Sequence, residues 1–172
     1  MNNSINQRYI LPIKLGRLFY RYRGIIATPF FILLLFLHRA QPTSPLPHLL
    51  IIIGLALRIW TSGYIGIISR SQEIAGEYKI VNGPYFFFRH PLYLGNFFLV
   101  LGTILLFNPP CGLKILLVLI FLFEYATIIL AEEDYLKGLP PVKVRFSWKK
   151  SRTELSTIIV LGIIYLIYFI LR

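Results

Sequence analysis

The chain alternates long apolar stretches with short connections in which prolines and charged residues collect. The apolar stretches lie at about residues 25–38, 46–69, 92–107, 113–131 and 156–171. A helix needs about 20 residues to cross the hydrocarbon core of a membrane, with roughly 17 as a lower limit. The second and fourth stretches reach this length, and the others reach it with flanking aromatic and basic residues that extend to the interface. The pattern predicts an all-α polytopic membrane protein with about five transmembrane helices.

Residues 108–112, Asn-Pro-Pro-Cys-Gly, form a very short connection between the third and fourth stretches. Its prolines end the preceding helix, so the chain has room only for a tight reversal. We therefore expect an antiparallel helical hairpin. Gly95 and Gly102 lie about two turns apart on one face of its first helix, where either a neighbouring backbone or a ligand could come close.

Composition agrees with a membrane protein. Hydrophobic residues make up 56% of the chain, charged residues 15%, and the mean hydropathy is +0.69. A soluble domain has about 45–50% apolar residues. The net charge of +11 comes from basic residues between the apolar stretches, not along one basic helix, so nucleic acid is excluded as a partner. The single Cys111 and three scattered histidines indicate neither a disulfide nor a metal site.

Basic residues collect in the N-terminal segment, between the second and third stretches, and between the fourth and fifth. The exceptions are Arg39, Lys114, Arg172 and, within the second stretch, Arg58. The positive-inside rule then places the N-terminus and both long connections in the cytoplasm and the C-terminus outside. No cleavage signature follows the first stretch, so we interpret it as a retained span.

We divide the chain into a basic cytoplasmic segment, residues 1–24, and a membrane domain, residues 25–172. The charge of the first segment suits contact with anionic membrane lipids. Nothing in the sequence indicates an oligomeric state.

Charged residues of opposite sign flank the predicted hairpin. Arg89 and His90 precede its first helix, and Glu132, Glu133 and Asp134 end its second. Each cluster has the unfavourable sign for its helix dipole, at a cost of about 0.3–1 kcal/mol per charge. Such a local conflict is typical of a functional site. We expect a cytoplasm-facing pocket that holds both a cation and an anion; the structural alternative is an ion pair of Arg89 that closes the hairpin.

Aromatic residues surround the first cluster. They are Tyr85, Phe86, Phe87, Phe88 and Tyr93. Aromatic side chains gather at membrane interfaces, and their faces also attract cations. The sequence leaves both interpretations open, an interfacial belt or a pocket wall.

Residues 83–96, Gly-Pro-Tyr-Phe-Phe-Phe-Arg-His-Pro-Leu-Tyr-Leu-Gly-Asn, resemble the signature of the isoprenylcysteine carboxyl methyltransferase and phospholipid methyltransferase superfamily. Residues 57–65, 131–136 and 146–156 resemble further segments of that superfamily in the same order, so the resemblance covers about residues 50–172. It implies a membrane enzyme that uses S-adenosylmethionine and methylates a lipophilic acceptor on the cytoplasmic side.

The resemblance also implies which residues surround the cofactor. They are Gly83, Tyr85, His90, Pro91, Tyr93, Gly95, Glu132 and Glu133. In this interpretation the two glutamates hold the charged or ribose groups of S-adenosylmethionine. No metal ion is implied.

Methyl transfer to a carboxylate depends mainly on positioning and on exclusion of water. An arginine orients such an acceptor by a bidentate contact. Arg89 is the first candidate and Arg58 the second, and His90 would take the proton of an amine or phenol acceptor. Arg58 lies inside a span, where a charge costs at least ~2.5 kcal/mol. It therefore either pairs with Glu124 or contacts the substrate head group.

Other functions remain open at this stage. The chain runs almost directly from Tyr135 to Pro140, where the superfamily has a longer segment over the cofactor, and this favours a non-catalytic homologue as one alternative. A sterol-type membrane reductase with a nicotinamide cofactor shares the Arg-His-Pro-x-Tyr pattern and is another. A channel or transporter is least favoured, because no charged stripe crosses a span. Prenylated cysteine, a phospholipid amine and a small lipid acid all remain possible acceptors.

Overall fold

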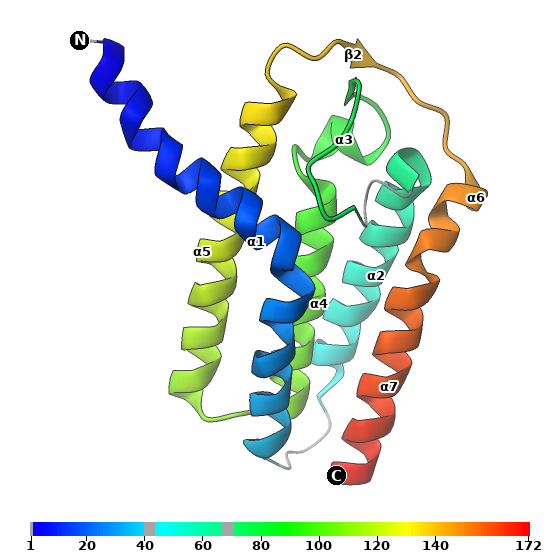
Figure 1. Ribbon diagram of the computed structural model, residues 1–172. Coiled ribbons are helices and arrows are strands. Elements are labelled where there is room, and N and C mark those ends of the chain that lie inside the picture. The colour runs from blue at the N-terminus through cyan, green and yellow to red at the C-terminus, as the bar shows by residue number, and fades with distance from the viewer. Residues whose placement is uncertain (1, 40–43, 67–70) are drawn as a thin grey trace.

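The structure is a computed structural model of the chain, shown in Figure 1. It describes residues 2–39, 44–66 and 71–172, with side chains described from residue 10 onward. Two of the basic residues that support the predicted orientation in the membrane, Arg70 and the side chain of Arg8, lie outside the described residues.

Among the described residues, five long helices make up the bundle; Figure 1 shows their arrangement. They are α1 (Asn2–Phe36), α2 (Pro45–Ile65), α4 (Pro91–Phe107), α5 (Cys111–Leu136) and α7 (Leu155–Leu171). The short elements are β1 (Lys79–Ile80), α3 (Pro84–Phe87), β2 (Pro141–Val142), α6 (Trp148–Ser151) and the 3₁₀ helix η2 (Arg152–Glu154). Within the described ranges, four helices are long and apolar enough to cross a membrane, and α4 is a shorter apolar helix. The predicted all-α polytopic membrane fold is confirmed.

Proline and asparagine set the ends of the central helices. Pro45 and Pro91 begin α2 and α4, where a missing N–H costs nothing and the fixed φ suits a first turn. Asn108 ends α4 in the left-handed conformation (φ 48°), with its N–H donating to the Ile104 carbonyl at 3.1 Å. Pro110 then precedes α5. The predicted tight reversal is confirmed.

Helix α1 is one long bent helix (Figure 1). Pro12 and Pro29 lie inside it, and each removes an N–H and crowds the carbonyl four residues earlier. Near the second proline, the Thr28 hydroxyl donates to the Gly24 carbonyl at 3.0 Å. The basic N-terminal segment is therefore helical and continuous with the first span.

The helices pack as two pairs, because α4 lies along α2 and α1 lies along α5. A Cβ atom added at Gly54 would lie 2.7 Å from the Gly95 carbonyl oxygen, and one at Gly102 would lie 2.9 Å from the α2 backbone. A Cβ atom added at Gly16 would lie closer still to the carbonyl oxygen of Thr127. Gly95 and Gly102 thus permit close helix packing. The α4–α5 hairpin has the predicted direction, but its two helices pack mainly on other partners.

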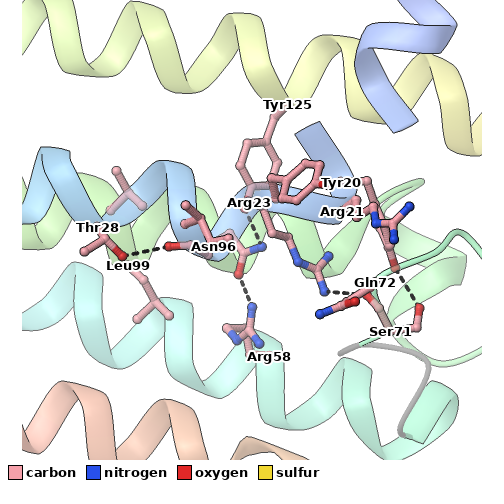
Figure 2. Close-up of a pocket in the computed structure, with 14 residues that line it drawn as sticks. Tyr20, Arg21, Arg23, Thr28, Arg58, Ser71, Gln72, Asn96, Leu99 and Tyr125 are labelled. Atoms are coloured by element: carbon pink, nitrogen blue, oxygen red, sulfur yellow. Dashed lines mark hydrogen bonds between the residues drawn. The ribbon is translucent and has the colours of Figure 1, made fainter. Parts of the chain in front are cut away.

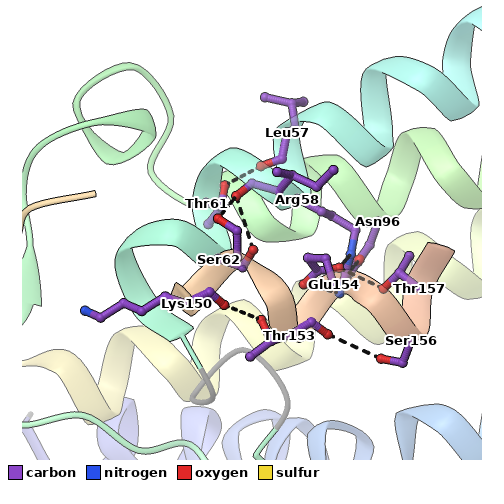
Figure 3. Close-up of polar contacts among 12 residues, drawn as sticks. Leu57, Arg58, Thr61, Ser62, Asn96, Lys150, Thr153, Glu154, Ser156 and Thr157 are labelled. Carbon is purple, nitrogen blue, oxygen red and sulfur yellow. Dashed lines mark hydrogen bonds and ion pairs between the residues drawn. The ribbon is translucent and has the colours of Figure 1, made fainter. Parts of the chain in front are cut away.

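A buried ion pair joins α2 to the start of α7 (Figure 3). The Arg58 Nε donates to Glu154 Oε2 at 2.8 Å and its Nη2 donates to Glu154 Oε1 at 3.1 Å. Thr157 donates to the same carboxylate at 2.7 Å, and Arg58 Nη1 donates to Asn96 on α4. The predicted partner Glu124 is wrong, because η2 brings Glu154 to the positive end of α7 directly beside Arg58.

Replacing Arg58 with methionine would leave Glu154 as an uncompensated buried charge. We expect the free energy of unfolding to fall by about 3–5 kcal/mol. The double variant Arg58→Met, Glu154→Met removes both charges and should recover most of that loss. Chemical unfolding of the detergent-solubilised proteins measures both effects, and a double variant as unstable as the single one would contradict the pairing.

The close approach of α2 and α4 predicts a contrast between two glycines. Gly54→Ala would push a Cβ into the α4 backbone and should lower the free energy of unfolding by about 1–3 kcal/mol. Gly162→Ala in α7 meets nothing within 4 Å and should be neutral or stabilising by up to about 1 kcal/mol. Thermal unfolding of both variants checks this, and equal effects would show that the glycine contact is unimportant.

Candidate functional site

The α2–α4 and α5–α6 connections lie at the same end of the bundle as the N-terminus, opposite the C-terminus (Figure 1). We call this the basic end, because most of the lysines and arginines belong to the two connections and the N-terminal segment. The helix α3 and the strand pair β1–β2 also lie there.

The two charge clusters meet at the basic end. His90, the N-cap of α4, places Nδ1 at 3.2 Å from Glu132 Oε2 and Nε2 at 3.1 Å from Glu133 Oε1. Arg89 Nε lies 2.9 Å from the same Glu133 oxygen. The predicted proximity of the clusters is confirmed, and so is an ion pair of Arg89 that ties α4 to α5.

His90 is surrounded in a way that favours its charged form. Burial opposes the imidazolium, but the hydrogen bonds and charges of Glu132 and Glu133 outweigh burial and raise the pKa of His90 above its ordinary value of 6.5. Both ring nitrogens then donate, one to each carboxylate. The carboxylates thereby offset the unfavourable placement of a cation at a helix N-terminus.

A pocket of about 630 Å³ opens beside this cluster, a size typical of small-molecule sites. We call it the basic-end pocket. The predicted residues that line it are Tyr85, Phe86, Phe87, Phe88, Arg89, His90, Glu132 and Glu133. Lys79 and Lys137 also line it, although sequence reasoning did not select them. Burial, followed by the charge of Glu132, raises the pKa of Tyr85, so its hydroxyl stays protonated and can donate.

The other four residues predicted to surround the cofactor are not among the described residues that line this pocket. Gly83 adopts φ +63° and packs directly on the Tyr64 ring, so only glycine fits there. Tyr93 is buried, and its ring stacks on His90 with centroids 5.8 Å apart. Gly95 lies against Gly54 and Arg58, at the α2–α4 contact. Pro91 is buried at the first position of α4. Their contact with a cofactor stays a prediction.

The connection after α5 closes over the α2–α4 connection. Strand β2 pairs in parallel with β1, and the Lys79 N–H donates to the Pro140 carbonyl at 2.9 Å. The Asn82 side chain exchanges two hydrogen bonds of 2.9 Å with the backbone of Val144. Because residues 79–81 line the basic-end pocket, the short connection of this chain holds one of its walls in place.

Two further cavities lie between the helix pairs. A cleft of about 720 Å³, lined by α1, α2, α4, α5 and residues 71–72, is shown in Figure 2, and we call it the lateral cleft. An apolar cavity of about 410 Å³ lies deeper among α1, α2, α4, α5 and α7. Both are bordered by Arg58, Leu99 and Val100, so they adjoin. The buried Glu124 Oε1, which has no hydrogen-bond partner among the described residues, belongs to a wall of the apolar cavity.

A small cavity of about 40 Å³, which we call the constriction, borders both the basic-end pocket and the lateral cleft. It shares Tyr85, His90 and Glu132 with the pocket and Tyr20 with the cleft. Tyr20 therefore lies at the border between this small cavity and the lateral cleft.

The model of the phospholipid methyltransferase family matches residues 44–139, more than half of the chain, and this range includes His90, Glu132 and Glu133. The chain belongs to the phospholipid methyltransferase family. No curated protein and no solved structure gives a significant match. The family and the apolar helices together identify an integral membrane protein of a methyltransferase family, and the family resemblance read from the sequence is confirmed.

Sequence reasoning missed several residues around the cavities. Glu154 could have been noticed as a lone acid at the start of the last apolar stretch. Asn96 accepts from Arg58 and donates to the Tyr125 hydroxyl at 3.0 Å. Its place at the end of the signature-like segment, as a polar residue in an apolar stretch, was a signal that sequence reasoning did not use. Tyr20 lies outside the range that matches the family, and only the packing of α1 brings it to the constriction.

The raised pKa of His90 predicts a pH-dependent contribution to stability. A raised pKa stabilises the fold fully below the ordinary value of 6.5, and the contribution is lost as the pH rises through the raised value. The stability difference between wild type and His90→Gln should therefore be largest in mild acid and shrink in alkali. Thermal unfolding from about pH 5 to 9 measures it, and a difference that grows with pH would contradict a charged His90.

Proposed function

We propose that the protein is an S-adenosylmethionine-dependent methyltransferase that modifies a lipophilic acceptor, with its basic end in the cytoplasm. The observation that carries this proposal is the convergence of Arg89 and His90 with Glu132 and Glu133 at the wall of the basic-end pocket. The membrane orientation rests on the positive-inside rule.

The donor set of the basic-end pocket fits the cofactor. S-adenosylmethionine carries an ammonium, a carboxylate, a sulfonium, ribose hydroxyls and an aromatic base. Carboxylates of Glu132 and Glu133 suit the ammonium or the hydroxyls, since His90 contacts only one oxygen of each and a carboxylate accepts several hydrogen bonds. Lys79, Lys137 and Arg89 suit its carboxylate, and the aromatic side chains suit the base and the sulfonium.

When bound, S-adenosylmethionine supplies an electrophilic methyl group. The residues of this chain have the tasks of binding, orienting and excluding water. His90, protonated and held by two carboxylates, orients the glutamate side chains; in this form it has no lone pair with which to accept a proton. The β1–β2 pair and the Asn82 hydrogen bonds keep the pocket wall in place.

The acceptor reaches the site from the membrane in this proposal. The apolar cavity suits a hydrocarbon chain, and the constriction at Tyr20 separates the acceptor side from the cofactor side. The sequence favours a carboxylate acceptor oriented by Arg89 or Arg58. In the structure Arg58 is bound by Glu154 and Arg89 by Glu133. An acceptor anion bound by either arginine would therefore have to compete with a carboxylate already in place.

The cofactor assignment predicts a sharp contrast between neighbouring acids. Glu132→Gln and Glu133→Gln should each weaken binding of labelled S-adenosylmethionine by about tenfold or more, because each removes a charge-assisted hydrogen bond. Asp134→Asn is the matched control, since Asp134 pairs with Arg17 and Lys137 at the surface. Equilibrium dialysis of the purified protein in detergent with added lipid measures the three constants.

No binding to the wild-type protein would overturn the proposal and favour a non-catalytic homologue. Equal losses in all three variants would show that the effect is general electrostatics and not contact with the cofactor.

A further inference from the structure

We propose that Arg21 and Arg23 of helix α1 form the recognition site for the anionic headgroup of a lipid, whose hydrocarbon chain occupies the apolar cavity. These arginines lie outside residues 44–139, the range that matches the family. That this lipid is the methyl acceptor rests on the proposed function; that it binds here does not.

The charge of the lateral cleft supports an anion. Three arginines, Arg21, Arg23 and Arg58, line it, and no Asp or Glu is among the described residues of its wall. Arg58 is already paired with Glu154, so its charge is compensated. Arg21 and Arg23 of α1 contribute the other two positive charges of the wall. An acid close by is Glu124, which lines the adjoining apolar cavity and interacts electrostatically with Arg23.

Arg23 is held in position. Its guanidinium lies over the ring of Tyr20, 4.4 Å from the ring centroid, and its Nη2 donates to the Ser71 carbonyl at 3.4 Å. The Tyr20 hydroxyl lies 3.3 Å from Ser71 Oγ, so this segment also orients the ring. Figure 2 shows Arg23 reaching from α1 across the cleft toward Ser71. A half-buried, oriented guanidinium offers several N–H donors in a fixed plane, which suits a phosphate or carboxylate.

The neighbouring cavity supports a hydrocarbon chain. The apolar cavity shares Leu99 and Val100 with the lateral cleft, so a headgroup in the cleft can continue into it as a chain. Its walls are mainly the apolar side chains of α1, α4, α5 and α7, including Phe30, Leu117 and Leu161. A cationic cleft adjoining an apolar cavity is complementary to an anionic amphiphile.

The position of this site also suits a reactant. Tyr20, which supports Arg23, lines both the lateral cleft and the constriction next to the basic-end pocket. A headgroup bound by Arg23 therefore lies one cavity away from His90 and Glu132. We assign Arg23 as a specificity-determining residue and Arg21 as its partner at the cleft wall.

The test is a binding measurement that needs no methyl transfer. The purified protein in an uncharged detergent is titrated with hexadecyl phosphate and palmitate as anionic probes, hexadecanol as an uncharged probe, and inorganic phosphate as a headgroup without a chain. Both anionic amphiphiles should bind at least about tenfold more tightly than hexadecanol, the difference expected for a charge-assisted contact. Inorganic phosphate should bind much more weakly, because it lacks the chain.

Matched variants then locate the site. Arg23→Gln should weaken binding of the anionic probes by about tenfold and leave hexadecanol unchanged. Arg17→Gln, on the same helix but at the exposed surface beside Asp134, should leave both unchanged. Arg23→Lys should fall between wild type and Arg23→Gln, because it keeps the charge but loses the planar fork.

Three results would overturn the proposal: equal binding of hexadecanol and hexadecyl phosphate, equal losses in Arg17→Gln and Arg23→Gln, or tight binding of inorganic phosphate alone. Binding of S-adenosylmethionine to Arg23→Gln is measured in parallel. Retained cofactor binding with lost lipid binding supports the headgroup site and shows that the variant is folded. If the wild type binds the lipid but no cofactor, the proposed function fails and the headgroup site stands.

Discussion

The close backbone contacts at a few glycines determine the shape of this bundle. Gly54 meets Gly95 between α2 and α4, and Gly16 meets Thr127 between α1 and α5. Because lipid gives apolar helices no hydrophobic reason to associate, such close packing is a main source of their association in a membrane. Two tightly packed pairs result, and the lateral cleft and apolar cavity lie between them. The same contacts that stabilise the helices therefore also create space for a lipid.

Polar and charged contacts connect the α2–α4 pair to the α1–α5 pair at two places, one at the basic end and one in the middle of the bundle. At the basic end, His90 and Arg89 of the α4 N-terminus meet the glutamates of α5. Deeper in the bundle, Asn96 of α4 donates to the Tyr125 hydroxyl of α5 and accepts from Arg58. Arg58 in turn joins α2 to α7 through Glu154. A buried ion pair is weak evidence for net stability, but breaking one is costly, so these contacts favour one arrangement of the pairs. The cavities between them are thereby held in a defined shape.

The basic end shows how one contact serves both structure and chemistry. The ion pair of Arg89 with Glu133 ties α4 to α5, as the structural alternative for the two charge clusters predicted. The same glutamate also lines a pocket with aromatic, acidic and basic walls. The short connection after α5 adds to this by pairing with β1 instead of forming a longer cover. A chain of modest length can therefore both close its hairpin and keep a polar pocket beside it.

The sequence alone determined the fold class, the helix boundaries near Pro91 and Asn108, and the meeting of His90 with Glu132 and Glu133. Hydrophobic length, proline position and hairpin connectivity are local properties, and they suffice for these conclusions. Only the tertiary structure decided that Arg58 pairs with Glu154, that Gly95 packs on Gly54, and that α1 completes the cavities. Each of these depends on which helices lie side by side and at what separation. That outcome comes from packing between distant segments, which no spacing within one segment encodes.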